Sequence, residues 1–132
     1  RLEGCYAHGD TIYFTSTSGG DAASGQVWAY DAKASVLQLV YESPAQETLY
    51  YPDNLAMSPR GGLILCQDSY RQEAQSLFGL TPEGGLFEFA RNSTRLDGEQ
   101  GFRGEFHNSE FAGACFSPDG RWLFVNVYTP GY

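Results

Sequence analysis

The segment "SPRGGLILCQDS" (Ser58–Ser69) returns in altered form as "SPDGRWLFVNVY" (Ser117–Tyr128). Each copy reads Ser-Pro, a polar residue, Gly, and then an apolar stretch. Ser-Pro ends one strand, the polar-Gly pair turns the chain, and the apolar stretch forms the second strand of a hairpin. A hairpin phrase that recurs within one chain predicts a repeated all-β unit.

Short alternating segments bounded by Gly, Pro, Asp and Ser fill most of the chain, and helical periodicity is scarce. The expected strands are 4–8, 11–17, 26–30, 36–41, 54–58, 63–67, 76–81, 86–90, 111–117 and 122–128. Four short antiparallel strands per unit, repeating about every fifty residues, are typical of propeller blades. A sandwich also has short strands, but it does not explain the recurrent turn phrases. The sequence therefore predicts an all-β fold, a β-propeller segment of about two and a half four-stranded antiparallel blades.

The expected organisation is a blade over 1–45, a second blade over 46–93, an insertion loop over 94–109 and a half blade over 110–132. Propellers normally have at least four blades, and an open one exposes its sheet edges. We therefore expect this chain to be a portion of a larger propeller, or to close by association with copies of itself or with another chain. Long polar insertions are often functional or mobile, and we expect the segment 94–109 to be either functional or mobile.

The 132 residues carry a formal net charge of −8, which makes nucleic acid an unfavourable partner. No apolar run approaches the roughly twenty residues of a membrane span. The charge serves either solubility alone or the binding of a hard cation by clustered carboxylates. Buried free thiols are the default expectation for the three cysteines, Cys5, Cys66 and Cys115.

Unusual polar groups lie where the chain enters each first strand, and the first strands of a propeller line one central channel. These groups belong to the phrases Arg1-Leu2-Glu3-Gly4, Pro52-Asp53-Asn54 and Glu110-Phe111-Ala112-Gly113, and Asp68 follows a second strand. Carboxylate and amide oxygens from several strands can surround calcium, and an arginine fork beside them can clamp a phosphate or carboxylate. The alternative is that the acidic groups are solvated strand-start residues and turn formers that cap their own backbone.

Five phrases taken together resemble, in order, the C-terminal part of PhoX-type bacterial alkaline phosphatases. They are "RLEGCYAHGDTIYFTSTSGG", "GQVWAYD", "PDNLAMSPRGGLILCQD", "LFGLTPEGGLFEFARN" and "EFAGACFSPDGRWLFVNVYTPG". The resemblance implies a six-bladed propeller, an exported (periplasmic or extracellular) phosphomonoesterase, and calcium and iron ions in the channel.

The resemblance also implies roles for individual residues. Arg1 would act in catalysis and, with Asn54, in binding the phosphate ester substrate. The metal ligands would be Glu3, Asp53, Asp68 and Glu110. The metals would act as Lewis acids on the phosphoryl oxygens, and arginine would stabilise the developing charge.

The family's N-terminal blades, which provide further ligands including an iron-binding cysteine, are not matched here. We therefore expect this chain alone to be inactive and to bind its metals weakly. Two other functions remain open: a non-catalytic propeller fragment that acts as a self-assembling or interaction module, and a calcium-dependent lactonase-like propeller. The R-x-E-G and E-F-A-G phrases favour the phosphatase.

Overall fold

In a computed structural model, described for residues 1–45, 48–70 and 73–128, the chain consists almost entirely of antiparallel strands. The strands are β1 (Leu2–His8), β2 (Thr11–Ser16), β3 (Gln26–Asp31), β4 (Val36–Glu42), β5 (Pro52–Met57), β6 (Leu63–Gln67), β7 (Ser76–Leu80), β8 (Leu86–Arg91), β9 (Arg95–Asp97), β10 (Arg103–Glu105), β11 (Phe111–Phe116) and β12 (Leu123–Val127). Two sheets have four strands, in the orders β1-β2-β3-β4 and β5-β6-β7-β8, and the pairs β11-β12 and β9-β10 form two smaller sheets. The prediction of an all-β fold is confirmed.

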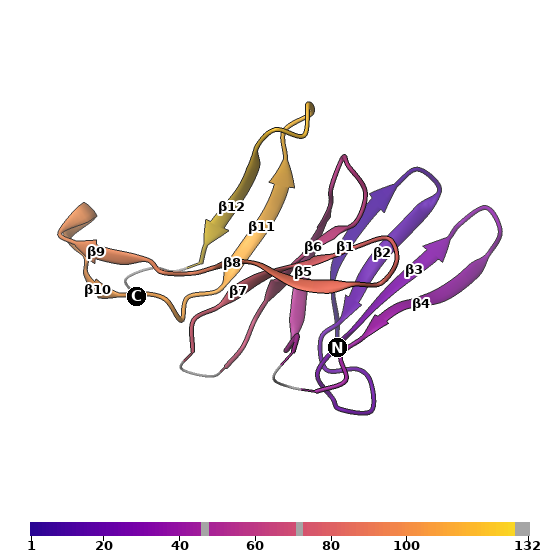
Figure 1. Ribbon diagram of the computed structural model, residues 1–132, viewed down its shortest axis with the longest axis horizontal. Coiled ribbons are helices and arrows are strands. Elements are labelled where there is room, and N and C mark those ends of the chain that lie inside the picture. The colour runs from indigo at the N-terminus through magenta and orange to yellow at the C-terminus, as the bar shows by residue number, and fades with distance from the viewer. Residues whose placement is uncertain (46–47, 71–72, 129–132) are drawn as a thin grey trace.

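The three larger sheets lie side by side like successive blades (Figure 1). β1 packs against β5, and β5 packs against β11, so the first strands of the three sheets are neighbours. In Figure 1 the hairpins that join first and second strands point upward, and the entries to the first strands lie at the lower end. We call these the hairpin end and the entry end of the stack. This arrangement agrees with the predicted propeller-like blade segments. The last residues assigned to the half blade, 129–132, lie outside the described residues.

The second sheet is apolar on both faces because it lies between the other two. Along β6, Leu65 faces the first sheet, whereas Ile64 and Cys66 face the third. The first interface buries Val27, Leu49, Leu55, Leu63, Leu65 and Leu80. The second buries Ala56, Ile64, Cys66, Leu77, Phe111 and Ala114. A strand covered on both faces appears as a continuous apolar run, and "LILC" is such a run.

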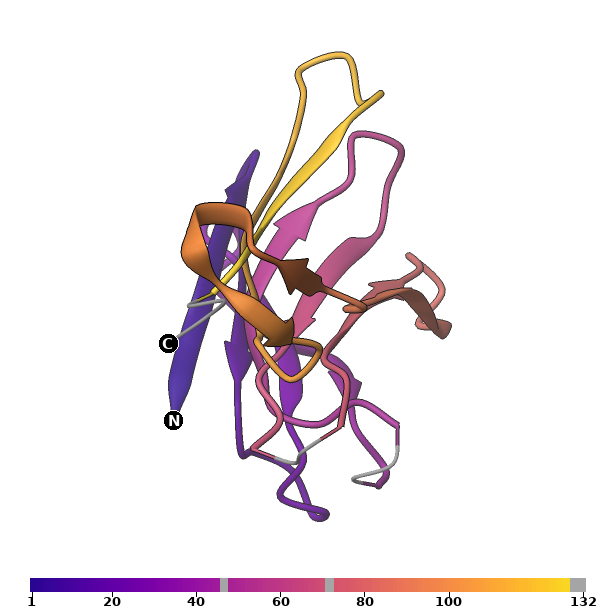
Figure 2. The same cartoon turned by 90° about the vertical axis from the view of Figure 1, so that its left-hand side faces the viewer.

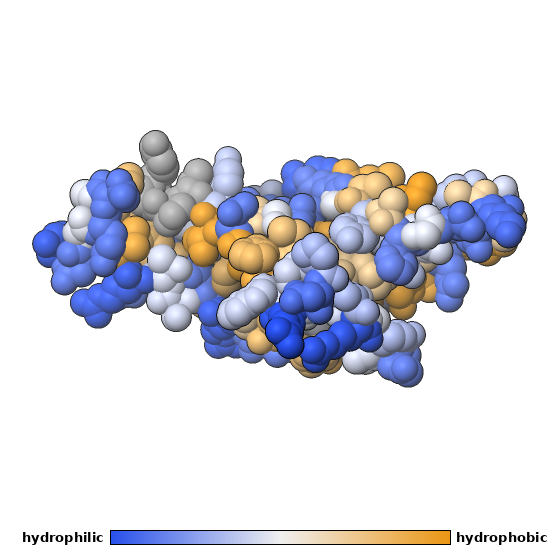
Figure 3. Space-filling view, turned by 90° about the horizontal axis from the view of Figure 1, so that it is seen from above, coloured by the Kyte–Doolittle hydropathy of each residue, from blue (hydrophilic) through white to orange (hydrophobic). Residues whose placement is uncertain are grey.

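The outer faces of the first and third sheets are open among the described residues. Leu37 on β4 and Phe124 on β12 are more than half exposed, at 55% and 58%. Seen from the hairpin end, apolar surface shows between the hydrophilic tips (Figure 3).

Cys5 and Cys115 are exposed, so the expectation of buried thiols is wrong for both and holds only for Cys66. Successive strand residues face opposite sides. Gly4 and Ala114 face inward, so Cys5 and Cys115, which directly follow them, face outward.

The segment expected as an insertion loop contains a small hairpin, β9 and β10, joined by a short 3-10 turn (Figure 2). Asn92 anchors its start. The buried side-chain amide of Asn92 donates to the carbonyls of Phe106 (2.9 Å) and Ser109 (2.7 Å), and its oxygen accepts the Thr94 amide (2.9 Å). These bonds return the chain to the entry of β11.

Candidate metal and phosphate site

Each first strand carries an irregularity in its pairing near the entry end. The register shifts between Leu2 and Cys5 in β1, between Pro52 and Asn54 in β5, and between Ala112 and Cys115 in β11. In β5 the extra residue is Asp53. A bulge bends a strand and re-aims the side chain of the extra residue, and bulges are frequent next to active sites. The three irregularities therefore lie in the same first strands whose entries carry the predicted site residues.

Three half-buried carboxylates meet at the entry end: Asp53 in the β5 bulge, Asp68 just after β6, and Glu110 just before β11. Each offers one oxygen, and the three oxygens lie within 4.8 Å of one another. They come from the middle and third sheets, whose packing brings them together although Asp53 and Glu110 are far apart in sequence. The arrangement suits a hard cation with oxygen ligands.

The electrostatics of this group favour an added positive charge. Burial, together with the charges of Asp68 and Glu3, raises the pKa of Asp53 to about 6. Burial, a hydrogen bond with Asp68 and the neighbouring carboxylates raise the pKa of Glu110 to about 8. Like charges disfavour each other's ionised forms, and a cation between them would reverse this effect.

One oxygen of the group has no hydrogen-bond partner. Asp53 Oδ1 is buried, and no donor among the described residues reaches it. A buried polar atom without a partner is costly, and binding of an ion is one of the usual reasons that such an atom persists. This orphaned oxygen is an observation independent of the clustering, and the donor set therefore fits a calcium-like cation.

Arg1 and Glu3 form an ion pair beside the carboxylates. Arg1 Nε lies 2.9 Å from Glu3 Oε1, and the hydroxyl of Thr17, a buried residue, donates to Glu3 Oε2 at 2.6 Å. These two bonds lower the pKa of Glu3 against the opposing effect of its burial. Half of the Arg1 side chain remains exposed, so its guanidinium can still reach an anion.

Gly4 allows β1 to approach β5 closely. A Cβ atom on Gly4 would lie 2.7 Å from the carbonyl oxygen of Asp53 and 2.8 Å from the Cα of Asn54. Both are backbone atoms, so a larger residue could fit only if a strand moved. The glycine of the R-x-E-G phrase thus places Glu3 next to the β5 bulge.

Cys66 lies within the electrostatic reach of Asp53 and Glu110 but is fully buried. Burial first, and then these two charges, raise the pKa of its thiol to about 12. In the metal-free chain the thiol therefore stays protonated at neutral pH and is a poor nucleophile, because the thiolate is the nucleophilic form.

The structure brings together three of the predicted ligands, Asp53, Asp68 and Glu110, and it pairs Glu3 with Arg1 beside them. Asn54 lies opposite Cys66 in the β5–β6 register, and its substrate-binding role stays a prediction. Sequence reasoning missed Thr17 because its place beside Arg1 depends on the fold: Leu2 pairs with Ser16, and the Thr17 amide donates to the Arg1 carbonyl.

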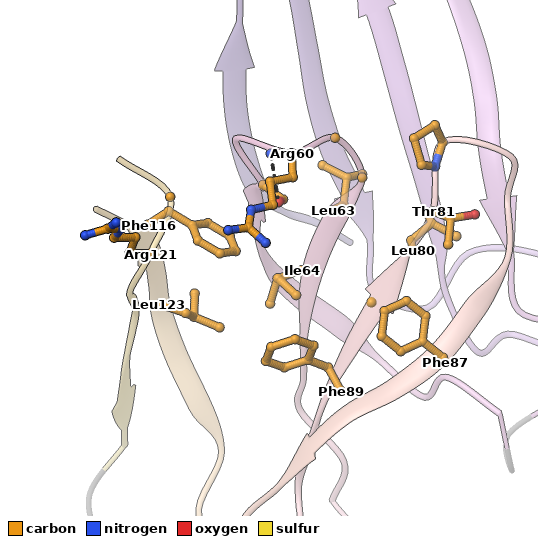
Figure 4. Close-up of a pocket in the computed structure, with 16 residues that line it drawn as sticks. Arg60, Leu63, Ile64, Leu80, Thr81, Phe87, Phe89, Phe116, Arg121 and Leu123 are labelled. Atoms are coloured by element: carbon orange, nitrogen blue, oxygen red, sulfur yellow. Dashed lines mark hydrogen bonds between the residues drawn. The ribbon is translucent and has the colours of Figure 1, made fainter. Parts of the chain in front are cut away.

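An apolar cavity lies elsewhere, at the hairpin end between the second and third sheets (Figure 4). It measures about 450 Å³, and Ile64, Phe89 and Leu123 point into it. None of its lining residues is acidic. The cavity is therefore separate from the carboxylates.

The family model for the alkaline phosphatase PhoX matches residues 1–131. No curated protein and no solved structure matches the chain with significance. Among the described residues no helix combines the length and apolar character that a membrane crossing would need. The match runs through all three larger sheets and both ends of the stack, and the chain therefore belongs to the PhoX alkaline phosphatase family.

Proposed function

We propose that this chain forms the cation- and phosphate-binding part of a metal-dependent alkaline phosphatase that hydrolyses phosphate monoesters. The observation that carries the proposal is the meeting of Asp53, Asp68 and Glu110 within 4.8 Å. Membership of the PhoX family supports a phosphatase origin. The same resemblance leads us to propose a periplasmic or extracellular location.

Asp53, Asp68 and Glu110 would hold calcium, which prefers carboxylate oxygens. When bound, the cation would supply Lewis-acid stabilisation of charge on a phosphoryl oxygen. The resemblance also leads us to propose iron as a second metal of the site. Cys66 is fully buried, and we assign it no metal.

Arg1 would bind a phosphoryl oxygen through its planar guanidinium and stabilise the charge that develops during transfer. Glu3 holds the guanidinium at 2.9 Å, and Thr17 fixes Glu3 in turn. The carboxylates alone would repel a phosphate dianion. Phosphate binding should therefore depend on prior binding of the cation.

The first experiment titrates inorganic phosphate into the purified chain with and without calcium, in the native sequence and in Glu110→Gln. We expect phosphate to bind only with calcium, and Glu110→Gln to abolish or strongly weaken it. Asp97→Asn, at an exposed carboxylate of the β9–β10 hairpin, is the matched control. Equal phosphate binding with and without calcium would contradict the proposal.

Turnover is tested separately, by hydrolysis of p-nitrophenyl phosphate with calcium and iron supplied, alongside the mass in solution. Turnover that disappears in Glu3→Ala and Glu110→Ala would assign catalysis to this chain. Absence of turnover, together with calcium-dependent phosphate binding, would restrict the chain to the binding part of the enzyme.

The exposed apolar side chains favour a second candidate, a self-assembling module. Leu2, Leu37 and Phe124 are all more than half exposed on the two outer sheets. Contiguous exposed apolar surface often marks a protein–protein contact, and open sheet edges can pair with other strands. Absence of turnover combined with a large assembly in solution would support this candidate over the phosphatase.

A further inference from the structure

Three tyrosines form a cluster at the entry end: Tyr50, Tyr51 and Tyr70. The rings of Tyr50 and Tyr51 are stacked, with centroids 4.0 Å apart and planes at 16°. Tyr70 meets Tyr51 edge-on, at 5.7 Å and 77°. The edge-on contact is a favourable aromatic geometry. Tyr51 lies two residues before Asp53, and Tyr70 lies two residues after Asp68.

The backbone of Tyr51 is in an unfavourable conformation. Its φ of 53° lies in the left-handed region, where a bulky residue is an outlier. The Asp68 amide donates to the Tyr51 carbonyl at 2.9 Å and helps to hold that conformation. Strain of this kind clusters at ligand clamps and active sites, where the surroundings maintain it. The bond also joins the aromatic cluster directly to a carboxylate of the proposed site.

Tyr70 is the exposed member of the cluster, with 68% of its surface accessible. Glu3 first, and then the Tyr70 hydroxyl, raise the pKa of Arg1, so this hydroxyl lies beside the guanidinium that also pairs with Glu3. The edge-on contact with Tyr51 positions the ring, while most of the residue's surface faces solvent. A tyrosine needed only for packing would not have to keep its ring accessible beside an anion-binding group.

We propose that Tyr70, supported by Tyr51, makes the site prefer phosphate monoesters whose alcohol part is aromatic. This inference rests on the proposed phosphatase function. With the phosphoryl group on Arg1 and the cation, the esterified group extends toward the adjacent accessible surface, and Tyr70 provides an aromatic face there. Tyr70 is a specificity-determining residue in this account.

The test compares two phosphonates that cannot be hydrolysed, phenylphosphonate and propylphosphonate, titrated calorimetrically into the full chain with calcium present. We expect the native chain to bind phenylphosphonate roughly three- to tenfold more tightly, the range that one aromatic pair provides. Tyr70→Ala should remove that difference. Tyr70→Phe keeps the ring and loses only the hydroxyl, so it should retain the difference.

Trp122→Ala is the matched control. Trp122 is equally exposed, at 67%, but lies next to the turn at the hairpin end, and its replacement should leave both affinities unchanged. Thermal melting checks that every variant is folded.

Equal affinity of the native chain for the two phosphonates would overturn the inference and leave the proposed function standing. A phenyl preference that survives in Tyr70→Ala would also overturn the inference. Failure of both phosphonates and of inorganic phosphate to bind in the presence of calcium would overturn the proposed function and the inference with it.

Discussion

The two ends of the second and third sheets show opposite chemistry on the same strands. At the entry end, β5, β6 and β11 bring Asp53, Asp68 and Glu110 together. At the hairpin end, β6 and β12 contribute Ile64 and Leu123 to an apolar cavity. Between the two ends lies a tightly packed layer that includes Leu77 and Phe111.

This difference indicates how a chain can hold like charges close together. Asp53 directly follows the buried Pro52, and Glu110 directly precedes the buried Phe111. Burial of apolar surface, at about 25 cal/mol per Å², stabilises the stack and can offset the repulsion at one of its ends. The predictions below weaken either the packing or the charge.

The largest effect is expected from Phe111→Ala. Phe111 is 8% exposed at the interface of the second and third sheets, and its loss should lower the free energy of unfolding by about 3–5 kcal/mol. Urea unfolding measures this. The matched control, Phe124→Ala, removes a ring that is 58% exposed on the neighbouring strand and should stay within about 0.5 kcal/mol. Similar losses in both variants would show that the packed layer does not hold the sheets together.

Gly4→Ala should cost about 2 kcal/mol and also weaken calcium binding, because its Cβ would meet the backbone of Asp53 and Asn54. Chemical unfolding and a calcium titration measure the two effects. Gly85→Ala, where the Cβ would meet only the Thr81 side chain at 3.2 Å, should cost less. If Gly4→Ala were neutral in both measurements, the close approach of β1 to β5 would not position the site.

Stability without calcium should fall as pH rises from about 5 to about 8. The folded pKa values of Asp53 and Glu110, about 6 and about 8, lie above the unfolded ones, so the folded chain binds more protons in this window. The stability that Asp53 and Glu110 contribute is fully present below their pKa values in the unfolded chain. It is lost as pH rises through their pKa values in the folded chain. Both groups are partly exposed, so we expect a discounted loss of about 1–2 kcal/mol.

Melting temperature against pH measures this loss. Saturating calcium should remove the dependence, and Glu110→Gln should reduce it. Apo stability that rises steadily with pH over this window would contradict the raised pKa values.

Thr17→Val should have the smallest effect, about 1 kcal/mol, because it removes one hydrogen bond to the partly exposed Glu3. It should also weaken calcium-dependent phosphate binding, since Glu3 would hold Arg1 less firmly. Thr94→Val, at a half-buried threonine in the connection that follows β8, is the comparison. Equal phosphate affinity in both variants would mean that Thr17 does not position Glu3.

The sequence predicted the repeated hairpins well because turn residues and alternating patterns are local signals. The strand 63–67 has the bounds expected, and most other ends differ by one or two residues. The β9–β10 hairpin was missed because its three-residue strands are short and polar, and Asn92 holds the segment through bonds that no local pattern reveals. The exposure of Cys5 depends on which face of β1 is covered, which is a tertiary property.

The sequence indicated residues that the fold brings close together, and their roles stay predictions, but it did not indicate their geometry. Acidic residues at strand entries indicated Glu3, Asp53 and Glu110, whereas the bulge at Asp53 depends on the register of β5 against β6. The tyrosine cluster was not predicted either. Tyr51 and Tyr70 come from different connections, and only the fold brings their rings together.

The most direct test of the central claim is a calorimetric titration of calcium into the native chain and into the triple variant Asp53→Asn, Asp68→Asn, Glu110→Gln. We expect the native chain to bind calcium and the triple variant, which has similar side-chain volumes but none of the three charges, to bind at least tenfold more weakly. Asp97→Asn serves as the single-charge control. Calcium binding that is unchanged in a folded triple variant would contradict the claim that the three carboxylates form a cation site.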